Sequence, residues 1–346
     1  MKITFRFLIF ISLAICSCER NNNNARRTSI SYEIVFTEYV NDSTSQIVKI
    51  NDDATNKTII LKNDKDPVNT GEIFNNTFLF SERKRNGDST FLYSFDLTNN
   101  TSTLITKGAY SLYISTMSPN RTKIAFDKNF KLGIINFNGS NNISLPYNLP
   151  ADAIGDGAFK FTKDNSIIIF QKDGDILSSI NTDGTNLVTL SEGLIFDYIS
   201  GGFSVSPDNK IIYVNSDNPN QIKSISYNGQ NESLIYSDPN LSELLNPVIS
   251  NDGSKIVFVK YETTGIINLC MINIDGSGFR KLTNNTSSVS NMIYSGIEWS
   301  PDDNKILFVE FNESVQNYLR IKVYNAIDDS FKIISENAIN IGHWVK

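Results

Sequence analysis

The sequence predicts an all-β fold assembled from seven copies of one four-stranded unit. Two turn motifs recur along the chain at almost the same interval, and no convincing amphipathic helix interrupts them. A fixed period of about 20 to 50 residues is the mark of a repeat architecture. The chain also has 346 residues, more than the roughly 250–300 at which a single core stops growing. Stacked repeats account for both observations.

The first recurring motif is a strand, a tight turn and a second strand. Its clearest copy is "EWSPDDNKILFVEF", Glu298–Phe311. Proline pre-sets φ in such a turn, and Asn or Gly accepts the left-handed position that follows. The nearly continuous apolar run "KILFVEF" suits a strand covered on both faces. Each turn begins with Ser or Thr, at intervals of 44, 44, 44 and 50 residues: Ser118, Thr162, Ser206, Ser250 and Ser300.

The second recurring motif is an Asn-Gly or Asp-Gly turn that ends the third strand of each unit. Such dipeptides between strand-like runs are the strongest short hairpin signals. The glycines Gly139, Gly184, Gly229 and Gly276 are spaced 45, 45 and 47 residues apart. A short apolar segment such as "LVTL" follows each turn and predicts a fourth strand. The unit is therefore four antiparallel strands.

Two weaker units precede these five. Asn76–Thr106 supplies the second, third and fourth strands of one unit, and Tyr32–Leu61 resembles another unit without its first strand. The segment Ile339–Lys346, at the other end of the chain, looks like the missing strand. Radial repetition of four-stranded sheets leaves only short, protected edges. We therefore predict a seven-bladed β-propeller closed by the C-terminal strand, with six blades as the alternative if Tyr32–Leu61 is an irregular cap.

The unit "W-S-P-D-x-x-K-I-x-F … D-G" resembles the WD-like repeat of TolB-like propellers. The resemblance covers about residues 30–346 and is strongest in the last five units. It implies the fold, whereas propellers of this kind serve both as partner-binding scaffolds and as domains of peptidases and lyases. The full motif is present at Trp299, Ser300, Pro301, Asp302, Lys305, Ile306 and Phe308.

The N-terminus has the features of an export signal. Lys2 and Arg6 precede "FLIFISLAI", an apolar run too short to span a bilayer as a stable helix. The following "ICSC" resembles the lipobox of bacterial lipoproteins, which implies cleavage before Cys18 and lipidation of its thiol. An ordinary secretory signal cleaved near Ser17, or modification of Cys16, is the alternative.

These features predict three regions: a signal peptide at 1–17, the lipidated cysteine with a flexible tether at 18–29, and the propeller at 30–346. Removal of 1–17 takes away two basic residues and no acid, so the net charge changes from −6 to −8. That charge argues against a nucleic-acid partner. We expect the protein in the bacterial cell envelope, tethered to the outer membrane by its lipid only and facing the periplasm or the surface.

The sequence contains no recognisable catalytic set, metal site or cofactor motif. His343 is the only histidine, and no G-x-S-x-G elbow is present. We expect His343 to be a partly buried strand residue beside Trp344. The acidic turns lack the length and terminal glutamate of a calcium loop, so their Asp and Asn residues are expected to serve hairpin geometry. Cys270, within "INLCMINI", is expected to be a small buried hydrophobe.

Aromatic and acidic residues gather in the loops between units and between second and third strands, which share one face of a propeller. Exposed aromatics beside carboxylates suit peptide or glycan contacts. We expect Tyr113, Phe159 and Phe203 to be packing residues of inner strands instead. The predicted partner-binding residues are Tyr110, Asp156, Asp197, Tyr198 and Tyr294.

The sequence therefore favours a non-enzymatic, lipid-anchored binding scaffold for a protein or glycan of the envelope. The alternative is a propeller hydrolase or lyase that acts on a saccharide or peptide. Such an enzyme would use loop carboxylates such as Asp156 and Asp197, because paired carboxylates alone can run glycoside hydrolysis. The sequence sets neither the partner's identity nor the oligomeric state.

Overall fold

The computed structural model describes residues 30–345, except 42–43, 63–66, 70, 84–89, 109–114, 150–158, 196–201, 287–291 and 313–318. At positions 41, 69, 83, 292–294 and 311–312 it describes the backbone only. These residues belong to one compact unit, Ser31–Lys346, apart from Ile30. All regular structure in them is β-strand, so the predicted all-β class is confirmed. No helix in this part of the chain is long and apolar enough to cross a membrane.

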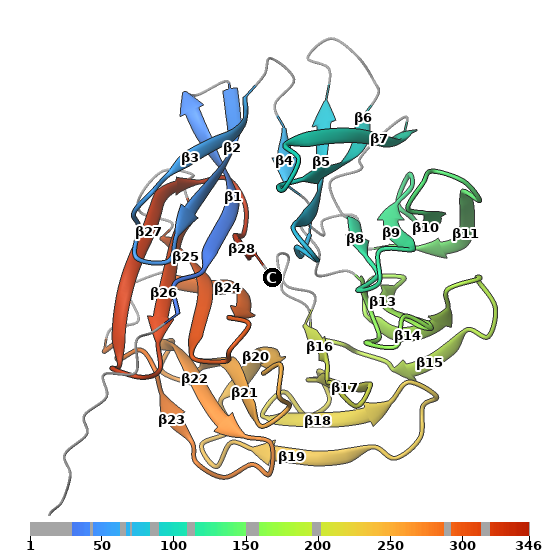
Figure 1. Cartoon of the computed structure of the whole chain (residues 1–346). Helices are drawn as coiled ribbons and strands as arrows, with labels where there is room; N and C mark the ends of the chain where they lie inside the picture. Colours follow the sequence, from blue (N-terminus) through green and yellow to red (C-terminus); the bar gives the residue numbers. More distant parts are fainter. Residues whose placement is uncertain are drawn as a thin grey trace, which may run out of the picture. The chain divides into compact units, whose positions relative to one another are not determined.

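Five of the sheets are four-stranded and antiparallel, and each follows the chain order of its strands (Figure 1). They are β4 (Val68–Asn69), β5 (Thr77–Arg83), β6 (Thr90–Asp96) and β7 (Thr101–Gly108); β8 (Ser115–Met117), β9 (Lys123–Asp127), β10 (Lys131–Asn136) and β11 (Ile143–Asn148); β12 (Phe159–Phe161), β13 (Ile167–Lys172), β14 (Ile176–Asn181) and β15 (Val188–Ser191); β16 (Phe203–Val205), β17 (Lys210–Tyr213), β18 (Gln221–Ser226) and β19 (Ser233–Ser237); and β20 (Glu243–Ile249), β21 (Lys255–Tyr261), β22 (Ile267–Asn273) and β23 (Arg280–Lys281).

A sixth sheet joins strands from the two ends of the described chain. It contains β24 (Met292–Trp299), β25 (Lys305–Asn312), β26 (Leu319–Asn325), β27 (Ser330–Ala338), β1 (Glu33–Asn41), β2 (Thr44–Asn51), β3 (Thr58–Lys62) and β28 (His343–Trp344). Strands β27 and β1 meet at the single residue pair Glu38–Ala338. Division at that pair gives two further groups of four, β24–β27 and β28 with β1–β3. The described strands thus form six hydrogen-bonded sheets or seven groups of four, and the seven-blade count stays a prediction.

The C-terminal segment completes the sheet begun by β1, as the sequence predicts. Trp344 pairs with Ile34, and the backbone N–H of Val345 donates to the Glu33 carbonyl at 2.9 Å. Figure 1 shows β28 beside β1. Trp344 is fully buried in a cluster that draws on both groups of the sixth sheet, including Leu307 of β25. Strands from opposite ends of the chain therefore share one core.

Each turn between first and second strands is built around the buried hydroxyl that the repeat predicted. Ser300 Oγ donates to Asp302 Oδ1 at 2.7 Å and accepts from the Lys305 N–H at 2.9 Å. The other four turns repeat both bonds, with Asn120 in place of aspartate in the first. A left-handed residue with φ between 55° and 75° stands two positions after the Pro, Lys or Asn of each turn: Arg121, Asn165, Asn209, Gly253 and Asp303. In the first and last turns this residue is Arg121 and Asp303, where the sequence pattern had favoured Asn or Gly.

The left-handed residue also links neighbouring sheets. Asn209 Oδ1 accepts from the Lys163 N–H at 2.9 Å, and Asp303 Oδ1 accepts from the Asn251 N–H at 2.8 Å. One junction departs from this pattern. Gly253 has no side chain, and the facing Pro207 has no N–H; a Cβ on Gly253 would lie 3.4 Å from Pro207 Cδ. The side chain at the left-handed position is therefore an inter-sheet contact.

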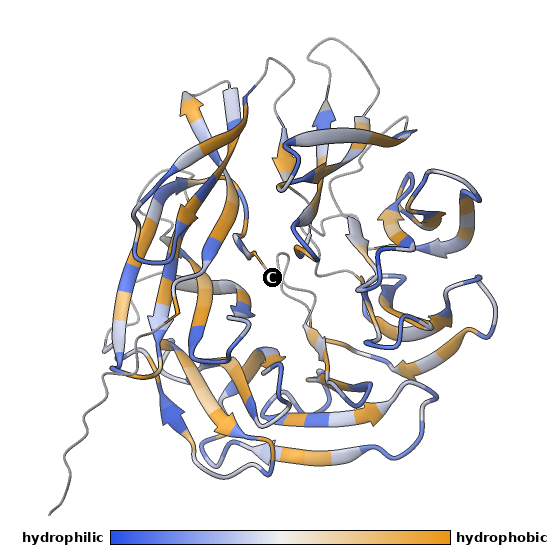
Figure 2. Cartoon of the chain, viewed as in Figure 1, coloured by the Kyte–Doolittle hydropathy of each residue, from blue (hydrophilic) through white to orange (hydrophobic). Residues whose placement is uncertain are grey.

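The second strand of each unit is covered on both faces, as its apolar run predicts. Ile306, Leu307, Phe308 and Val309 of β25 are all fully buried. Figure 2 shows hydrophobic residues concentrated along the strands and hydrophilic residues at many of the turns. These strands supply much of the buried apolar surface that stabilises the fold.

Two features were not predicted. Strand β4 has only two residues, too few for a sequence pattern, and it supplies the first strand of the Asn76 unit. In addition, the pairing between third and fourth strands shifts register in six of the groups. Bulges of this kind twist an edge strand and discourage pairing with another chain.

Candidate functional site

Most of the predicted site residues cannot be placed. Tyr294 lies in β24, but its side chain is outside the described part of the structure. The other predicted residues lie entirely outside it: Cys18, Tyr110, Asp156, Asp197 and Tyr198. Their roles in lipidation and partner binding stay predictions.

Two of the three aromatics expected to pack are confirmed as core residues. Phe159 in β12 and Phe203 in β16 are buried, each in a hydrophobic cluster. Tyr113 lies outside the described residues.

The inner strands surround a central cavity of about 100 Å³. One side chain from each of the seven groups lines it at an equivalent position, two residues before the turn hydroxyl in the five clear repeats. His343 occupies this position in β28, because Trp344 aligns with Trp299. Glu72 occupies it in the segment before β5. We call this set the channel ring: His343, Glu72, Thr116, Lys160, Ser204, Val248 and Glu298.

The channel ring contains two acid–base pairs that differ in exposure. Lys160 Nζ lies 3.4 Å from Glu72 Oε1, and the two side chains are 25% and 22% exposed. His343 Nδ1 lies 3.0 Å from Glu298 Oε2, and these side chains are 4% and 13% exposed. Water reaches the lysine pair much more readily than the histidine pair.

His343 has a role that the sequence did not predict. It is buried rather than partly buried, and it connects the closing strand to Glu298 of β24. The neighbouring Trp344 donates from Nε1 to the Glu298 carbonyl at 3.1 Å, and Trp299 donates in the same way to the Val248 carbonyl at 3.1 Å. The sequence did contain a signal for this role. When Trp299 of "GIEWS" is aligned with Trp344 of "NIGHW", Glu298 and His343 fall at the same position of neighbouring units.

The aspartates of the acidic hairpin turns accept hydrogen bonds from residues of the same turn. Asp183 Oδ1 accepts from the Thr185 N–H at 2.9 Å and from its hydroxyl at 2.6 Å. These bonds, the side-chain one first, lower the pKa of Asp183 below its usual value. The same arrangement recurs at Asp53 and Asp275. In the described parts of the chain, no group of three or more His, Cys, Asp or Glu gathers in a way that could hold a metal ion.

Cys270 is a buried strand residue, as the sequence predicts. Burial raises the pKa of its thiol to about 12. A thiol with such a pKa is almost wholly protonated at neutral pH, and the thiolate is the reactive form. Its role is packing.

No protein-family model matches the chain, and no curated protein is significantly similar to it. Solved structures do resemble it. TolB from Acinetobacter baumannii aligns with a TM-score of 0.56 and 12% identity, covering 91% of this chain and 66% of that one. The periplasmic gluconolactonase of Pseudomonas aeruginosa aligns at 0.57 and 10%, covering 92% and 99%. A prolyl endopeptidase aligns at 0.59 and 9%, covering 87% and 49%.

These similarities show a TolB-like β-propeller fold. At 9–12% identity they show the fold alone. The chain spans about two thirds of the TolB chain and about half of the endopeptidase chain. Because the neighbours include a TolB protein, a gluconolactonase and a peptidase, the fold does not decide between binding and catalysis.

Proposed function

We propose that the protein is a lipid-anchored propeller of the bacterial cell envelope that binds a protein or glycan partner without catalysing a reaction. The observation that supports this proposal is that the acidic side chains of the channel ring are paired with basic side chains. Glu72 is paired with Lys160 and Glu298 with His343, each from another strand or segment. A general acid or base must reach the proton that it transfers. These carboxylates instead contact bases of the protein itself.

The proposed partner face is formed by the loops that carry Tyr110, Asp156 and Tyr198. Tyrosine offers a large apolar surface and one polar tip, which suits both peptide and sugar contacts. The lipid on Cys18 would hold the protein at the membrane, where an envelope partner is concentrated. The periplasm and the cell surface both fit this arrangement.

The second candidate function is a hydrolase or lyase that acts on a saccharide or peptide. It is favoured by the fold shared with a gluconolactonase and a prolyl endopeptidase. Asp156 and Asp197 would be its carboxylates. Catalysis of glycoside hydrolysis requires two such groups about 5–10 Å apart across the scissile bond.

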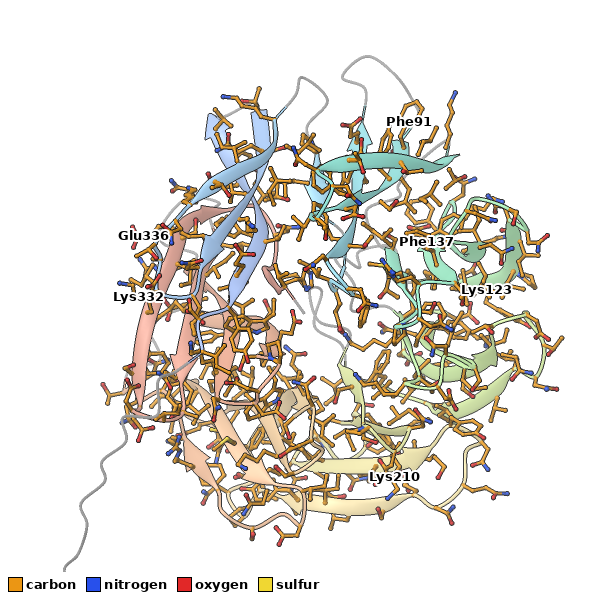
Figure 3. All side chains as sticks on the ribbon, in the orientation of Figure 1. Phe91, Lys123, Phe137, Lys210, Lys332 and Glu336 are labelled. Atoms are coloured by element: carbon orange, nitrogen blue, oxygen red, sulfur yellow. The ribbon has the colours of Figure 1, made fainter. Side chains whose placement is uncertain are left out.

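Partner binding is tested by a pull-down from solubilised envelope with the intact protein. We expect a partner that is lost with Tyr110→Ala and Tyr198→Ala and retained with Lys332→Ala. Lys332 is a matched exposed control on β27, and Figure 3 shows it at the outer edge of the molecule. Hydrolysis of an envelope glycan or peptide that disappears with Asp156→Asn or Asp197→Asn would instead establish the enzyme.

The anchor is tested separately. Cys18→Ala should abolish labelling by a radioactive fatty acid and release the protein from the membrane fraction. Cys16→Ala is the control and should change neither property. Labelling that persists in Cys18→Ala and disappears in Cys16→Ala would show that the other cysteine carries the lipid.

A further inference from the structure

We propose that an arc of exposed apolar side chains inserts into the headgroup region of a lipid bilayer. The arc lies on the sheets β16–β19 and β20–β23 and on the β24–β27 group. Figure 1 shows their fourth strands β19, β23 and β27 in succession along the outer edge of the molecule. We call these side chains the apolar arc: Leu234, Ile274, Phe279, Ile327, Phe331 and Ile333. The contact rests on the lipid anchor proposed above and adds the face of the molecule that the anchor brings to the membrane.

The apolar arc is exposed and runs from sheet to sheet. The exposed fractions of its members lie between 39% and 57%. Leu234 of β19 and Ile274 of the next hairpin turn line one groove between their sheets. The Phe279 ring stacks on Tyr236 of β19, with centroids 6.0 Å apart. A second groove joins β23 to Phe331 of β27. Contiguous exposed apolar surface of this kind marks a contact with a protein or a membrane.

The chain enters β1 at the same face of the molecule as the arc. The arc belongs to the turns between third and fourth strands and to the fourth strands that follow them. Strand β1 is the second strand of its group, so the residues before it stand where other groups have a turn between first and second strands. In an antiparallel sheet both kinds of turn lie at the same end of the strands. We call this end the turn face.

Two contacts fix the point of entry on the turn face. The Tyr32 N–H donates to Asp52 Oδ2 at 3.0 Å, directly after β2. The same oxygen lies 2.6 Å from Lys305 Nζ, at the start of β25. The N-terminal segment therefore leaves the molecule beside the β24–β27 group, which carries half of the apolar arc.

The position of the anchor makes a bilayer, rather than a protein, the occupant of the arc. Twelve positions separate Cys18 from Ile30. An extended chain spans at most about 3.3–3.6 Å per residue, so the lipid stays within about 40 Å of the turn face. The loops proposed to bind a partner belong to the opposite end of the strands. With the turn face on the bilayer, those loops are directed away from it and stay accessible.

The charges around the arc favour apolar insertion over attraction to anionic lipids. The three segments that carry the arc, 232–237, 273–281 and 325–336, contain five acidic and three basic residues. Clusters of four to eight Lys or Arg are what attract anionic lipids. Apolar side chains of an interfacial surface instead enter about 5–10 Å into the boundary between headgroups and acyl chains. We therefore expect a contact that persists on neutral lipids and in high salt.

The experiment places a fluorescent probe on the lipidated full chain in vesicles of phosphatidylcholine and phosphatidylethanolamine. Ile274→Cys and Ile327→Cys carry the probe NBD on the arc. Tyr261→Cys is the matched control, because its side chain is 41% exposed and lies at the other end of the sheet that carries Ile274. Cys270 is buried, and the unchanged protein treated in the same way gives the background labelling.

Phospholipids with a nitroxide on the headgroup quench a probe that reaches the bilayer surface. We expect a blue shift and loss of NBD emission at both arc positions, at low and high salt, and neither change at Tyr261→Cys. Circular dichroism of each variant checks that it folds. Unchanged emission at both arc positions would overturn the proposal, and so would equal quenching at Tyr261→Cys. Quenching that requires added phosphatidylglycerol would contradict apolar insertion.

Fatty-acid labelling of the same samples separates this proposal from that of the anchor. Protein without lipid would refute the anchor, and quenching at the arc in that protein would support the arc by itself. Absence of quenching would overturn the arc whether or not lipid is attached. An envelope protein that is captured by the unchanged protein and lost with Ile274→Asp, without quenching at the arc, would make the arc a protein interface instead.

Discussion

At the residue scale, the recurring turn is held by a hydroxyl–carboxylate bond that responds to acid. The Thr162 hydroxyl lowers the pKa of Asp164, and the Ser250 hydroxyl lowers that of Asp252. A carboxyl whose pKa is lower in the folded state contributes stability at pH values above its unfolded pKa, about 3.9. That contribution is lost as the pH falls below this value and passes the folded pKa. The urea midpoint should therefore fall between pH 5 and pH 3.

Ser250→Ala provides a matched comparison for this prediction. It removes the hydroxyl that donates to Asp252, so the acid-induced loss should be smaller in the variant than in the unchanged protein. A midpoint that is the same at pH 5 and pH 3 in the unchanged protein would show that these turn bonds are not linked to stability.

The junction between the turns that follow β16 and β20, where glycine at the left-handed position has no side chain to bridge them, offers a second test at this scale. Pro207→Lys with Gly253→Asn copies the bonded pair Lys163 and Asn209 of the preceding junction. The two changes together should create one hydrogen bond, and the double-mutant cycle should show a favourable coupling of about 0.5–1.5 kcal/mol. Urea unfolding of the two single variants and the double variant measures it. Additive single effects would mean that the left-handed side chain does not bridge the turns.

At the element scale, the sequence predicted the strands and turns that recur in each unit. It did not predict the features that occur only once. The second and third strands were predictable because each pairs an apolar run with a turn of fixed chemistry, as in "KILFVEF" after Ser300. Strand β4 was missed because two residues carry no periodicity. The ionic pairs of the channel ring were missed because Glu72 and Lys160 lie 88 residues apart. Only the folded arrangement of the sheets brings them together.

Two glycines in hairpin turns allow a test of how closely neighbouring sheets contact each other. A Cβ on Gly276, which has φ +81°, would lie 2.2 Å from the Ile235 carbonyl oxygen of β19. Gly174 has φ +99° and nothing within 4 Å of a Cβ. Gly276→Ala should therefore destabilise the protein by about 2–4 kcal/mol, through both strain and overpacking. Gly174→Ala should produce the strain component alone, about 1–2 kcal/mol.

Thermal melting of the two variants separates these contributions. A larger fall in Tm for Gly276→Ala supports a tight contact between its turn and the preceding sheet. Equal falls would mean that the turn does not press on β19 in solution.

At the scale of the whole molecule, the C-terminal segment docks against both β24 and β1. Ile341 packs against Gly296 of β24, where a Cβ would lie 2.2 Å from Ile341 Cγ2. His343 and Trp344 both contact Glu298, and Val345 pairs with Glu33. The last residues of a chain are usually dispensable unless they are docked in a sheet. Here they fill the inner position of the β1–β3 group.

The most direct test of this arrangement compares the melting of residues 25–346 with that of residues 25–338. The shorter chain would lose the inner strand and expose an unpaired edge of β1. It would also lose Trp344, and loss of a core tryptophan typically costs about 3–5 kcal/mol, a large share of the roughly 5–15 kcal/mol that stabilises a domain. We expect a much lower midpoint and a less cooperative transition in the shorter chain. Equal midpoints with equal cooperativity would contradict closure by the C-terminal strand, and the seven-blade count with it.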